Sequence, residues 1–476
     1  MLERIAALAR LKALLGPAGF LDEADRMAAY TAEQRGTTVG APLAVLRPDS
    51  TEQVAASVRV CAEAGIPLVP QGGNTGLAGG TVARPEAGAL LLNLTRMDRI
   101  RDLDPIDFTA TVEAGCVLQR LQEAVAAVDR LFPLSLAAEG SCTVGGILST
   151  NAGGTMTIRY GNARDLVLGL EVVLADGCVW HGLRRLRKDN TGYDLKQLFL
   201  GAEGTLGIIT AATLKLFPRP QRIDTALVAI ASPDAAIALS ARLRAATGEA
   251  LTAVEIMPRF AIEGAARYLG ETIDPLPHVQ APWYLLLELT AATDDGALHQ
   301  QVESVLADAQ QAGLVIDAAL AQSEAQRRKF WRMREALPEL GRRVDGALHH
   351  DVSVPVSRVP QFMAKAAAAV LAAVPGARPY PFGHIADGNI HFNIARPEAW
   401  TRERYLAEAP EVRRIVHDAA LAEGGSISAE HGIGDFKIDE LQRMKQPLEI
   451  ELMQRIKDAL DPSHLMNPGK ILKAPE

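Results

Sequence analysis

Residues 70–80 read PQGGNTGLAGG, and they follow a short apolar stretch at 67–70 that is typical of a strand. Runs of glycine let backbone N–H groups converge on the oxygens of a phosphate. The loop lacks both the Gly-Lys-Ser/Thr ending of a Walker loop and the GxGxxG spacing of a Rossmann turn. By itself it also fits a tight turn, so its meaning depends on what accompanies it.

Two more glycine-rich loops occur in the same half of the chain. Residues 140–154 read GSCTVGGILSTNAGG, and residues 201–210 read GAEGTLGIIT, which ends in an apolar strand pattern. The first two loops offer many small residues and hydroxyl groups but no lysine. This composition suits a long, extended ligand that is approached by the protein backbone, such as a dinucleotide.

A different motif lies at residues 382–393, FGHIADGNIHFN. Asp-Gly between alternating apolar residues predicts a β-hairpin with Asp387 and Gly388 at the turn. His384 would then pair directly with His391, with the two Cβ atoms roughly 5 Å apart on one face. Two imidazoles at that separation can bind one divalent metal. The alternative is a polar hairpin that carries two unrelated histidines.

A metal site of this kind needs a third protein ligand and keeps one position open for substrate. Glu430, in the stretch SISAEHGIG at 426–434, is the candidate for that ligand. Its neighbour His431 points to the opposite side if the stretch is extended, or into the cavity where the glycines break the strand. Asn393 lies on the same face as His391, because side chains alternate along a strand.

Length and composition limit the number of domains, the kind of partner and the cellular compartment. At 476 residues the chain suits two or three domains, and 48% hydrophobic residues provide ample core. A net charge of −8 argues against a nucleic-acid partner. The four cysteines are scattered without metal or redox spacing, which predicts reduced thiols in a reducing compartment.

The N-terminal residues 1–20 are amphipathic and resemble no signal peptide. No apolar run in the sequence reaches the roughly 18 residues that a membrane-spanning helix needs. We therefore expect a soluble cytoplasmic protein without a transmembrane segment.

The chain changes character along its length. Residues 1–36 have a helical pattern, and residues 41–215 alternate short strands with helices and glycines. Within the latter, Thr51 to Ala64 is predicted as a helix that Ser50 or Thr51 caps and Gly65 ends. Pro218-Arg219-Pro220 is a natural linker. From about 221 to 425, strands such as Thr225 to Ile230 and Tyr284 to Leu289 alternate with long, alanine-rich helices, which indicates an α+β sheet domain.

The motifs together resemble the FAD domain of the vanillyl-alcohol oxidase / p-cresol methylhydroxylase superfamily. More closely, they resemble the FAD-linked D-2-hydroxyacid dehydrogenases, the D-2-hydroxyglutarate and D-lactate dehydrogenase branch. Seven stretches carry the resemblance in the family's order: residues 71–76, 140–154, RKDNTGYDL at 187–195, 201–210, 384–391, EHGIG at 430–434 and NPGK at 467–470.

The resemblance implies an α+β fold in which a two-subdomain FAD-binding domain is joined to an α+β substrate (cap) domain with an antiparallel sheet. The expected segments are a helical segment at 1–36, the FAD-binding domain at 37–219, the cap domain at 220–425, and a C-terminal segment at 426–476 that packs back on the FAD domain.

The resemblance also implies which residues hold FAD. Relatives with covalent flavin carry a histidine in the first loop, where this chain has Asn74, so we expect non-covalent FAD. The implied cofactor-binding residues are Pro70, Gln71, Gly72, Gly73, Asn74, Thr75, Gly76, Ser141, Cys142, Thr143, Gly145, Gly146, Asn151, Gly204, Ile209 and Asn467.

For the reaction, the resemblance implies oxidation of a D-2-hydroxy acid by hydride transfer to FAD. Zinc or a similar divalent metal would be held by His384, His391 and Glu430, and His431 would be the base. Arg334, Asn393 and His349 are the implied substrate-binding residues. An arginine suits a carboxylate because its planar fork pairs both oxygens, although Arg334 also fits a surface position on a helix.

The chain departs from the D-2-hydroxyglutarate pattern at two places. Pro338 stands where that pattern has threonine, and His349 stands where it has lysine. Both family residues help to hold the distal carboxylate of the substrate. These two departures leave room for D-lactate or D-malate as the substrate, besides D-2-hydroxyglutarate.

Two other functions occur on the same fold, although only the first shares these motifs and the second lacks the metal hairpin. One is the flavin subunit of a multi-protein glycolate-oxidising complex, and the other is a non-redox FAD transferase of the alkyl-glycerone-phosphate synthase kind. The expected partners are a small 2-hydroxy acid and an electron acceptor, either an electron-transfer flavoprotein or a quinone. A homodimer is a further expectation.

Overall fold

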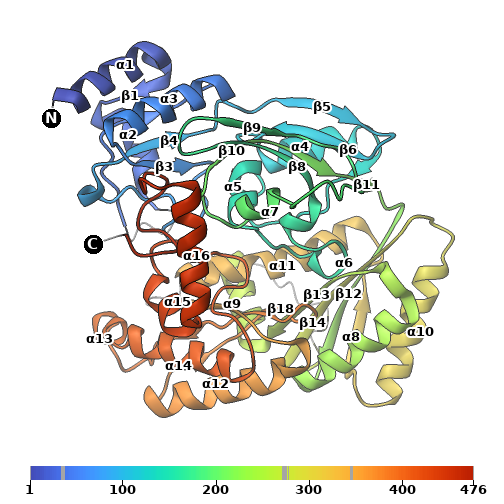
Figure 1. Cartoon of the computed structure of the whole chain (residues 1–476). Coiled ribbons are helices and arrows are strands. Elements are labelled where there is room, and N and C mark those ends of the chain that lie inside the picture. The colour runs from blue at the N-terminus through green and yellow to red at the C-terminus, as the bar shows by residue number, and fades with distance from the viewer. Residues whose placement is uncertain (1, 34–37, 271–275, 277, 344–346, 475–476) are drawn as a thin grey trace. The chain divides into compact units, whose positions relative to one another are not determined.

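A computed structural model of the chain describes residues 2–33, 38–270, 276, 278–343 and 347–474 (Figure 1). The chain forms two compact units. The first contains Met1–Gly153, Gly161–Arg219 and Glu430–Glu476, and the second contains Gly154–Tyr160 and Pro220–Ala429. The four segments predicted from the sequence stay a prediction.

The first unit opens with a small, mostly parallel sheet. Its strand order is β1 (Phe20–Leu21), β2 (Val45–Leu46), β4 (Leu90–Asn93) and β3 (Leu68–Gln71), and β1 is the antiparallel member. Helices α1 (Leu2–Gly19) and α3 (Thr51–Ala64) share a buried core with these strands. Helix α2 (Ala24–Thr31) follows β1, and the predicted helical residues 34–36 lie outside the described residues.

Helix α3 shows how local sequence sets these elements. The Ser50 side chain accepts a hydrogen bond from the N–H of Gln53 at 3.3 Å, which caps the start of the helix. Gly65 ends the helix with φ of +60°, a left-handed conformation that favours glycine. The predicted bounds of this helix are confirmed.

The second sheet of the first unit has five strands and is antiparallel. Its order is β5 (Ile100–Asp104), β6 (Thr109–Glu113), β10 (Ile208–Lys215), β8 (Val167–Val173) and β9 (Val179–Gly182). The inner strands are buried along nearly their whole length. The elements around the two sheets are α4 (Leu118–Ala126), α5 (Val144–Ser149), α7 (Lys196–Phe199), α15 (Ile438–Met444), α16 (Pro447–Leu460), the pair β7 (Arg130–Leu131) and β11 (Phe217–Pro218), and the short helices η1 (Pro85–Ala87) and η2 (Ala163–Leu166).

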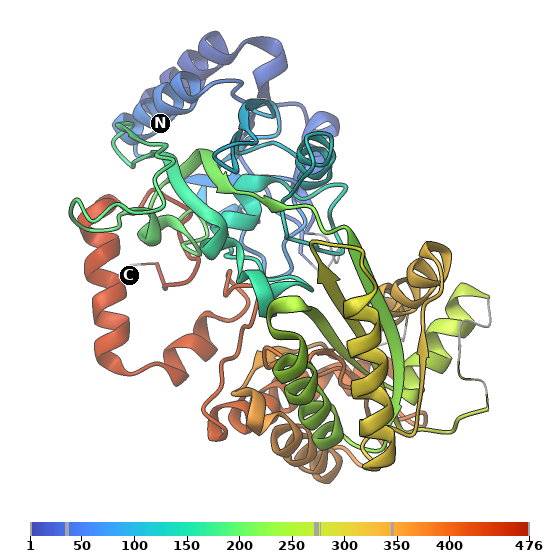
Figure 2. The same ribbon diagram turned by 90° about the vertical axis from the view of Figure 1, so that its right-hand side faces the viewer.

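The second unit is built on one five-stranded antiparallel sheet with helices on both faces. The order is β15 (Asp317–Leu320), β12 (Arg222–Ile230), β14 (Trp283–Ala291), β13 (Leu251–Pro258) and β18 (Gly383–His384). Helices α8 (Pro233–Thr247), α10 (Ala297–Gln311) and α12 (Val359–Ala373) share a core with one face. Figure 2 shows α8 and α10, in lime to gold, lying over the long strands.

The opposite face is covered by α9 (Arg259–Leu269) and α11 (Glu324–Arg343). Strand β12 shows why both faces are apolar: Ala226, Val228 and Ile230 enter one core, while Leu227 and Ala229 enter the other. Side chains alternate along a strand, so an uninterrupted apolar run serves two layers of helices.

Smaller elements complete the second unit. They are α6 (Thr157–Tyr160), α13 (Arg402–Ala407), α14 (Ala409–Ala422), η3 (Gly248–Ala250), η4 (Val356–Arg358), the strand pair β16 (Asp351–Ser353) with β19 (Asn389–His391), and the pair β17 (Arg378–Pro379) with β20 (Ile394–Ala395). Within the described part of the chain, no helix is both long and apolar enough to cross a membrane.

Candidate active site and cofactor cradle

The first and second glycine-rich loops lie against each other in the first unit. A Cβ atom at Gly72 would meet the Thr143 Oγ1 at 2.2 Å, and a Cβ atom at Gly73 would meet the Ser141 carbonyl oxygen at 1.9 Å. The contact at Gly73 is with backbone, so a side chain there would force the loops apart, whereas at Gly72 the Thr143 hydroxyl would have to turn away. The contact between the two loops therefore requires glycine at position 73.

The contact leaves a polar lining that fits a phosphate-containing ligand. Thr143 precedes α5, and its Oγ1 is buried without a hydrogen-bond partner among the described residues. Gly76, in the first loop, is exposed, and no described heavy atom lies within 4 Å of a Cβ placed there. A buried hydroxyl that needs a partner in one loop, and open glycine backbone in the loop that packs against it, match what the FAD diphosphate would require.

Other predicted cofactor residues make hydrogen bonds within the protein that hold the loops in place. The Gln71 side chain donates to the Tyr30 carbonyl at 2.9 Å, and the Asn74 side chain donates to the Ala32 carbonyl at 2.8 Å. Asn151 accepts the N–H of Arg164 at 2.9 Å. Burial raises the pKa of the Cys142 thiol to about 12, so this cysteine is an inert thiol in the loop.

The third loop and the C-terminal tail join the first loop. The Asn467 side chain donates to the carbonyl oxygens of Gly80 at 3.0 Å and Glu203 at 2.7 Å. Gly204 packs on the ring of Pro70, and its φ of +72° favours glycine. Asn467 thus links the first loop, the third loop and the tail. Ile209, another predicted cofactor residue, is buried in β10 at a break in the strand register.

Glu203 also fixes the segment that carries Glu430 and His431. Its carboxylate accepts the backbone N–H of Ile433 at 2.7 Å and that of Gly434 at 2.8 Å. Burial raises the pKa of Glu203, although both amides act in the opposite direction. Sequence reasoning missed this role, and the available signal was that Glu203 is the one acidic residue in the third loop.

Glu430 and His431 both belong to the first unit. Within that unit, the Nε2 atom of His431 lies 3.5 Å from the Oε1 atom of Glu430. Their predicted roles toward the histidines of the second unit stay predictions. The family-like stretch at 187–195 forms an exposed loop.

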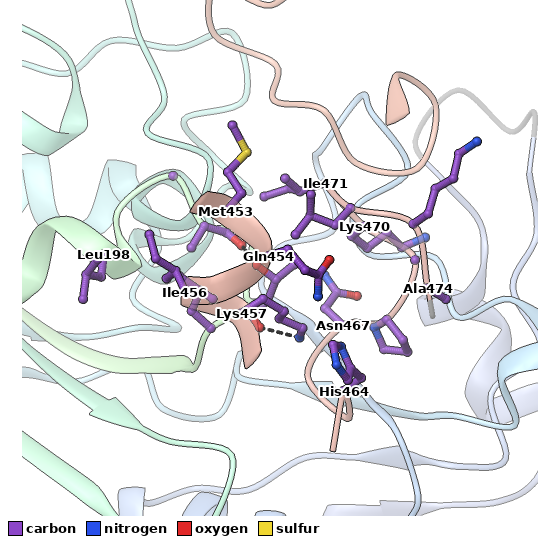
Figure 3. A pocket seen from close by; sticks show the side chains of 18 of the residues that line it. Leu198, Met453, Gln454, Ile456, Lys457, His464, Asn467, Lys470, Ile471 and Ala474 are labelled. Carbon is purple, nitrogen blue, oxygen red and sulfur yellow. Dashed lines mark hydrogen bonds between the residues drawn. The ribbon is translucent and has the colours of Figure 1, made fainter. Parts of the chain in front are cut away.

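A cavity of about 290 Å³ also lies in the first unit (Figure 3). The third loop, α16 and the tail residues 467–474 line it, and Met453, Ile456 and Ile471 make its wall largely apolar. Lys457 donates to the Thr205 carbonyl at 2.7 Å. Among the lining residues, Asn467 alone belongs to the predicted cofactor set.

In the second unit, the predicted hairpin register is wrong. His391 exchanges backbone hydrogen bonds with Phe382, at 3.2 and 2.8 Å, instead of pairing with His384. His384 pairs with Glu255 at the edge of the five-stranded sheet, and His391 pairs with Asp351. Strand β18 pairs with the longer strand β13, and β19 pairs with β16, a strand of equal length. These pairings outweigh the local turn preference.

The two imidazoles are nevertheless neighbours. Their ring centroids are 5.7 Å apart, and each Nδ1 atom faces a carboxylate. The His384 Nδ1 atom lies 2.6 Å from Glu255 Oε1, and the His391 Nδ1 atom lies 3.7 Å from Asp351 Oδ1. A carboxylate on Nδ1 is the usual arrangement behind a histidine that binds a metal through Nε2.

Arg334 is buried on α11, so the alternative of a surface arginine is wrong. Its Nε atom donates to Glu255 Oε2 at 2.6 Å, and its guanidinium lies over the Phe382 ring at 5.1 Å. Burial alone would raise the pKa of Glu255, but the charges of Arg334 and His384 outweigh it and hold that pKa well below its ordinary value.

Asn393 and His349 lie in the same unit. Asn393 is buried, and its carbonyl oxygen accepts the N–H of Tyr380 at 2.8 Å. His349 is half-buried next to His350, whose Nδ1 atom donates to the Phe392 carbonyl at 2.8 Å. The second unit therefore holds Arg334, Asn393 and the two predicted metal histidines.

Comparisons with known proteins define the class. A model described as "FAD binding domain" matches residues 42–182, and one described as "FAD linked oxidases, C-terminal domain" matches residues 219–471. The chain belongs to the FAD-linked oxidases. Its α+β fold of the vanillyl-alcohol oxidase / p-cresol methylhydroxylase type is confirmed.

The curated relatives narrow the class. The chain is 38% identical over 466 residues to the probable mitochondrial D-2-hydroxyglutarate dehydrogenase of Oryza sativa subsp. indica, covering 97% of this chain and 80% of the relative. It is 36% identical over 476 residues to the D-2-hydroxyglutarate dehydrogenase of Stutzerimonas stutzeri, covering 98% and 99%. The chain therefore belongs to the FAD-linked D-2-hydroxyacid dehydrogenase family, and the predicted resemblance is confirmed.

Solved structures agree on the fold. A p-cresol methylhydroxylase superposes with a TM-score of 0.78 at 20% identity, covering 99% of this chain and 97% of that one. The 4-ethylphenol oxidase of Gulosibacter chungangensis superposes with a TM-score of 0.74 at 20% identity, covering 100% and 98%.

Proposed function

We propose that the chain oxidises a D-2-hydroxy acid to the 2-oxo acid with FAD as its electron acceptor. The observation that carries the proposal is the similarity to D-2-hydroxyglutarate dehydrogenases along nearly the whole chain. The juxtaposed glycine loops and the His384–His391–Arg334 cluster supply the two kinds of site that this reaction needs.

FAD, when bound, supplies a two-electron acceptor for the hydride of the substrate α-carbon. The chain would hold it by Gly72 to Gly76, Ser141 to Gly146 and the residues around Ile209. The first loop carries Asn74 instead of a flavin-linking histidine, so the binding is non-covalent. Flavin that remains with the pellet after acid precipitation would refute this point.

The metal would be zinc or a similar divalent ion, held by His384, His391 and Glu430. A divalent ion at such a site polarises the oxygens of its substrate. The protein's part would be orientation, because Glu255 and Asp351 face the Nδ1 atoms of the two histidines and leave Nε2 as the nitrogen that could bind an ion. Glu430 would be the carboxylate ligand.

His431 takes the proton of the substrate hydroxyl as the general base. Histidine suits this role because a neutral imidazole can accept a proton near neutral pH. Glu203 fixes the backbone next to His431 through the amides of Ile433 and Gly434. That anchoring limits the positions that the imidazole can take.

Arg334 receives a carboxylate of the substrate, while Asn393 donates to the carboxylate or the hydroxyl. His349 and Pro338, which replace the lysine and threonine of the D-2-hydroxyglutarate pattern, alter the part of the site that meets the far end of the substrate. The substrate class is therefore D-2-hydroxyglutarate, D-lactate or D-malate.

Electrons leave the reduced protein for an electron-transfer flavoprotein or a quinone, and the chain works as a homodimer in the cytoplasm. The free cysteines support a reducing compartment, whereas the Oryza sativa relative is named as mitochondrial. Two alternatives keep the same fold: the flavin subunit of a glycolate-oxidising complex, and a non-redox FAD transferase.

An anaerobic screen of the FAD-loaded protein tests the proposal. D-2-hydroxyglutarate, D-lactate, D-malate and glycolate are each mixed with the protein before and after treatment with a chelator. Flavin bleaching by at least one D-2-hydroxy acid, lost on chelation, is the expected result. Bleaching by glycolate only with added subunits would favour the complex, and no bleaching by any acid would favour the transferase.

A further inference from the structure

We propose that Glu255 is a positioning residue that couples the metal histidine His384 to the substrate arginine Arg334. The inference rests on the proposed function and deepens it, because it assigns one carboxylate to two parts of the site. Glu255 lies on β13, where it faces His384 in the register of the sheet. No feature of the sequence pattern pointed to this residue.

The geometry of Glu255 is unusual for a carboxylate. It is fully buried, and its two oxygens are used by different partners. Oε1 lies 2.6 Å from the Nδ1 atom of His384, and Oε2 lies 2.6 Å from the Nε atom of Arg334. A buried charge is costly unless it is paired, so both contacts are needed to keep this carboxylate ionised in the interior.

The contact with His384 sets the state of that ring. A carboxylate that accepts the Nδ1 proton fixes the tautomer and makes Nε2 the nitrogen that donates its lone pair to a metal. Losing such a carboxylate typically weakens metal binding by about 10- to 100-fold.

The contact with Arg334 sets the direction of the guanidinium. Since Nε is occupied by Glu255, the edge that remains for a substrate carboxylate is the one with the two terminal Nη atoms. The Phe382 ring, 5.1 Å from the Arg334 Cζ atom, holds the plane of the group from one side. Glu255 therefore relates the direction of the arginine to that of the histidine.

The chain provides a matched control for Glu255. Glu288, on the neighbouring strand β14, is also buried and accepts hydrogen bonds from Arg327 at 3.0 Å and Trp331 at 2.6 Å. Arg327 lies on α11, the helix that also carries Arg334. Glu288 thus shares the sheet, the helix and the type of ion pair with Glu255, but its side-chain partners among the described residues are Thr225, Arg327 and Trp331 instead of His384 and Arg334.

The experiment measures Zn²⁺ affinity by competition with a chromogenic chelator, on FAD-loaded wild type, Glu255→Gln, Glu288→Gln and His384→Ala. We expect Glu255→Gln to raise the Kd for Zn²⁺ by about 10- to 100-fold and to raise KM for the D-2-hydroxy acid. Glu288→Gln should leave the Kd within about twofold of wild type. Glu255→Asp, which keeps the charge, should fold and bind Zn²⁺ with an intermediate Kd.

The four variants distinguish a failure of the Glu255 proposal from a failure of the proposed metal site. If His384→Ala loses Zn²⁺ while both Glu255 variants keep wild-type affinity, the inference alone is overturned. Equal weakening in Glu255→Gln and Glu288→Gln would also overturn it, because the effect would then be a general loss of sheet stability. If wild type and His384→Ala bind Zn²⁺ equally, the proposed metal site fails and the role of Glu255 fails with it.

Discussion

Two glycines of the first loop, only three residues apart, should respond differently to the same substitution. A Cβ atom at Gly73 would stand 1.9 Å from the Ser141 carbonyl oxygen, whereas a Cβ atom at Gly76 would meet no described atom within 4 Å. We therefore expect Gly73→Ala to damage the fold of the loops and Gly76→Ala to damage only the binding of FAD.

The distances set the size of each effect. At Gly73 the carbonyl must retreat by about 1 Å before the contact reaches the 3.0 Å below which real Cβ contacts are essentially never seen. Overpacking of this kind costs about 1–3 kcal/mol. At Gly76 the methyl group has room in the protein alone, so the free energy of unfolding should stay the same or rise by about 0.4–1 kcal/mol.

The cofactor changes the outcome at Gly76. If the backbone there approaches the FAD diphosphate, an added methyl group occupies that space and costs about 1–3 kcal/mol of binding. Since each 1.4 kcal/mol is a factor of ten, the Kd for FAD should rise roughly 5- to 150-fold.

Urea unfolding of the apoprotein and FAD titration by fluorescence quenching measure the two effects separately. Gly73→Ala should lose both stability and FAD, while Gly76→Ala should lose only FAD. The reasoning is refuted if Gly76→Ala binds FAD as tightly as wild type, or if Gly73→Ala leaves the unfolding curve unchanged.

Three further changes test the second unit and the base. Arg334→Ala should raise KM for a dicarboxylate substrate roughly 30-fold, because a charge-assisted pair of about 2 kcal/mol is lost; steady-state kinetics at matched FAD content would reveal an unchanged KM if the residue is only structural. His431→Ala should still bind FAD, Zn²⁺ and substrate but reduce flavin about 10²- to 10⁴-fold more slowly in anaerobic stopped flow, because the general base is lost. A mutant that keeps the wild-type rate of reduction would show that His431 only supports the site. Burial lowers the pKa of His350 to about 3, so between pH 6.5 and 3 the unfolded chain binds a proton that the folded protein does not, and stability falls as the pH falls. At pH 5 this group lowers the free energy of unfolding by about 2 kcal/mol. In urea unfolding, the free energy of His350→Asn should therefore depend less on pH than that of wild type or of the exposed-site control His278→Gln. Identical pH dependence in all three proteins would contradict this role of His350.

Elements whose causes are local could be predicted from the sequence. Helix α3 was predicted within its observed bounds because Ser50 and Gly65 are strong capping residues at both ends. Strand β12 was predicted because an apolar run bounded by polar residues needs two covered faces. In both cases a few neighbouring residues contain the whole signal.

Features that depend on distant partners could not be predicted. The Asp387-Gly388 turn suggested a register for His384 and His391 that the five-stranded sheet and β16 overrule. Arg334 looked like a possible surface residue because its partner Glu255 lies 79 residues earlier in the chain. The anchoring of the 430–434 segment by Glu203 spans a still longer separation of 230 residues.

Single-turnover reduction with paired enantiomers tests whether the chain passes a hydride from a D-2-hydroxy acid to FAD. FAD-loaded protein is mixed anaerobically with the D or the L form of one 2-hydroxy acid, and both the flavin absorbance and the 2-oxo acid are measured. We expect the D form to bleach the flavin and to yield one 2-oxo acid per FAD, while the L form does neither. A flavin that stays oxidised with every D-2-hydroxy acid, or that is reduced equally fast by the L form, would contradict it.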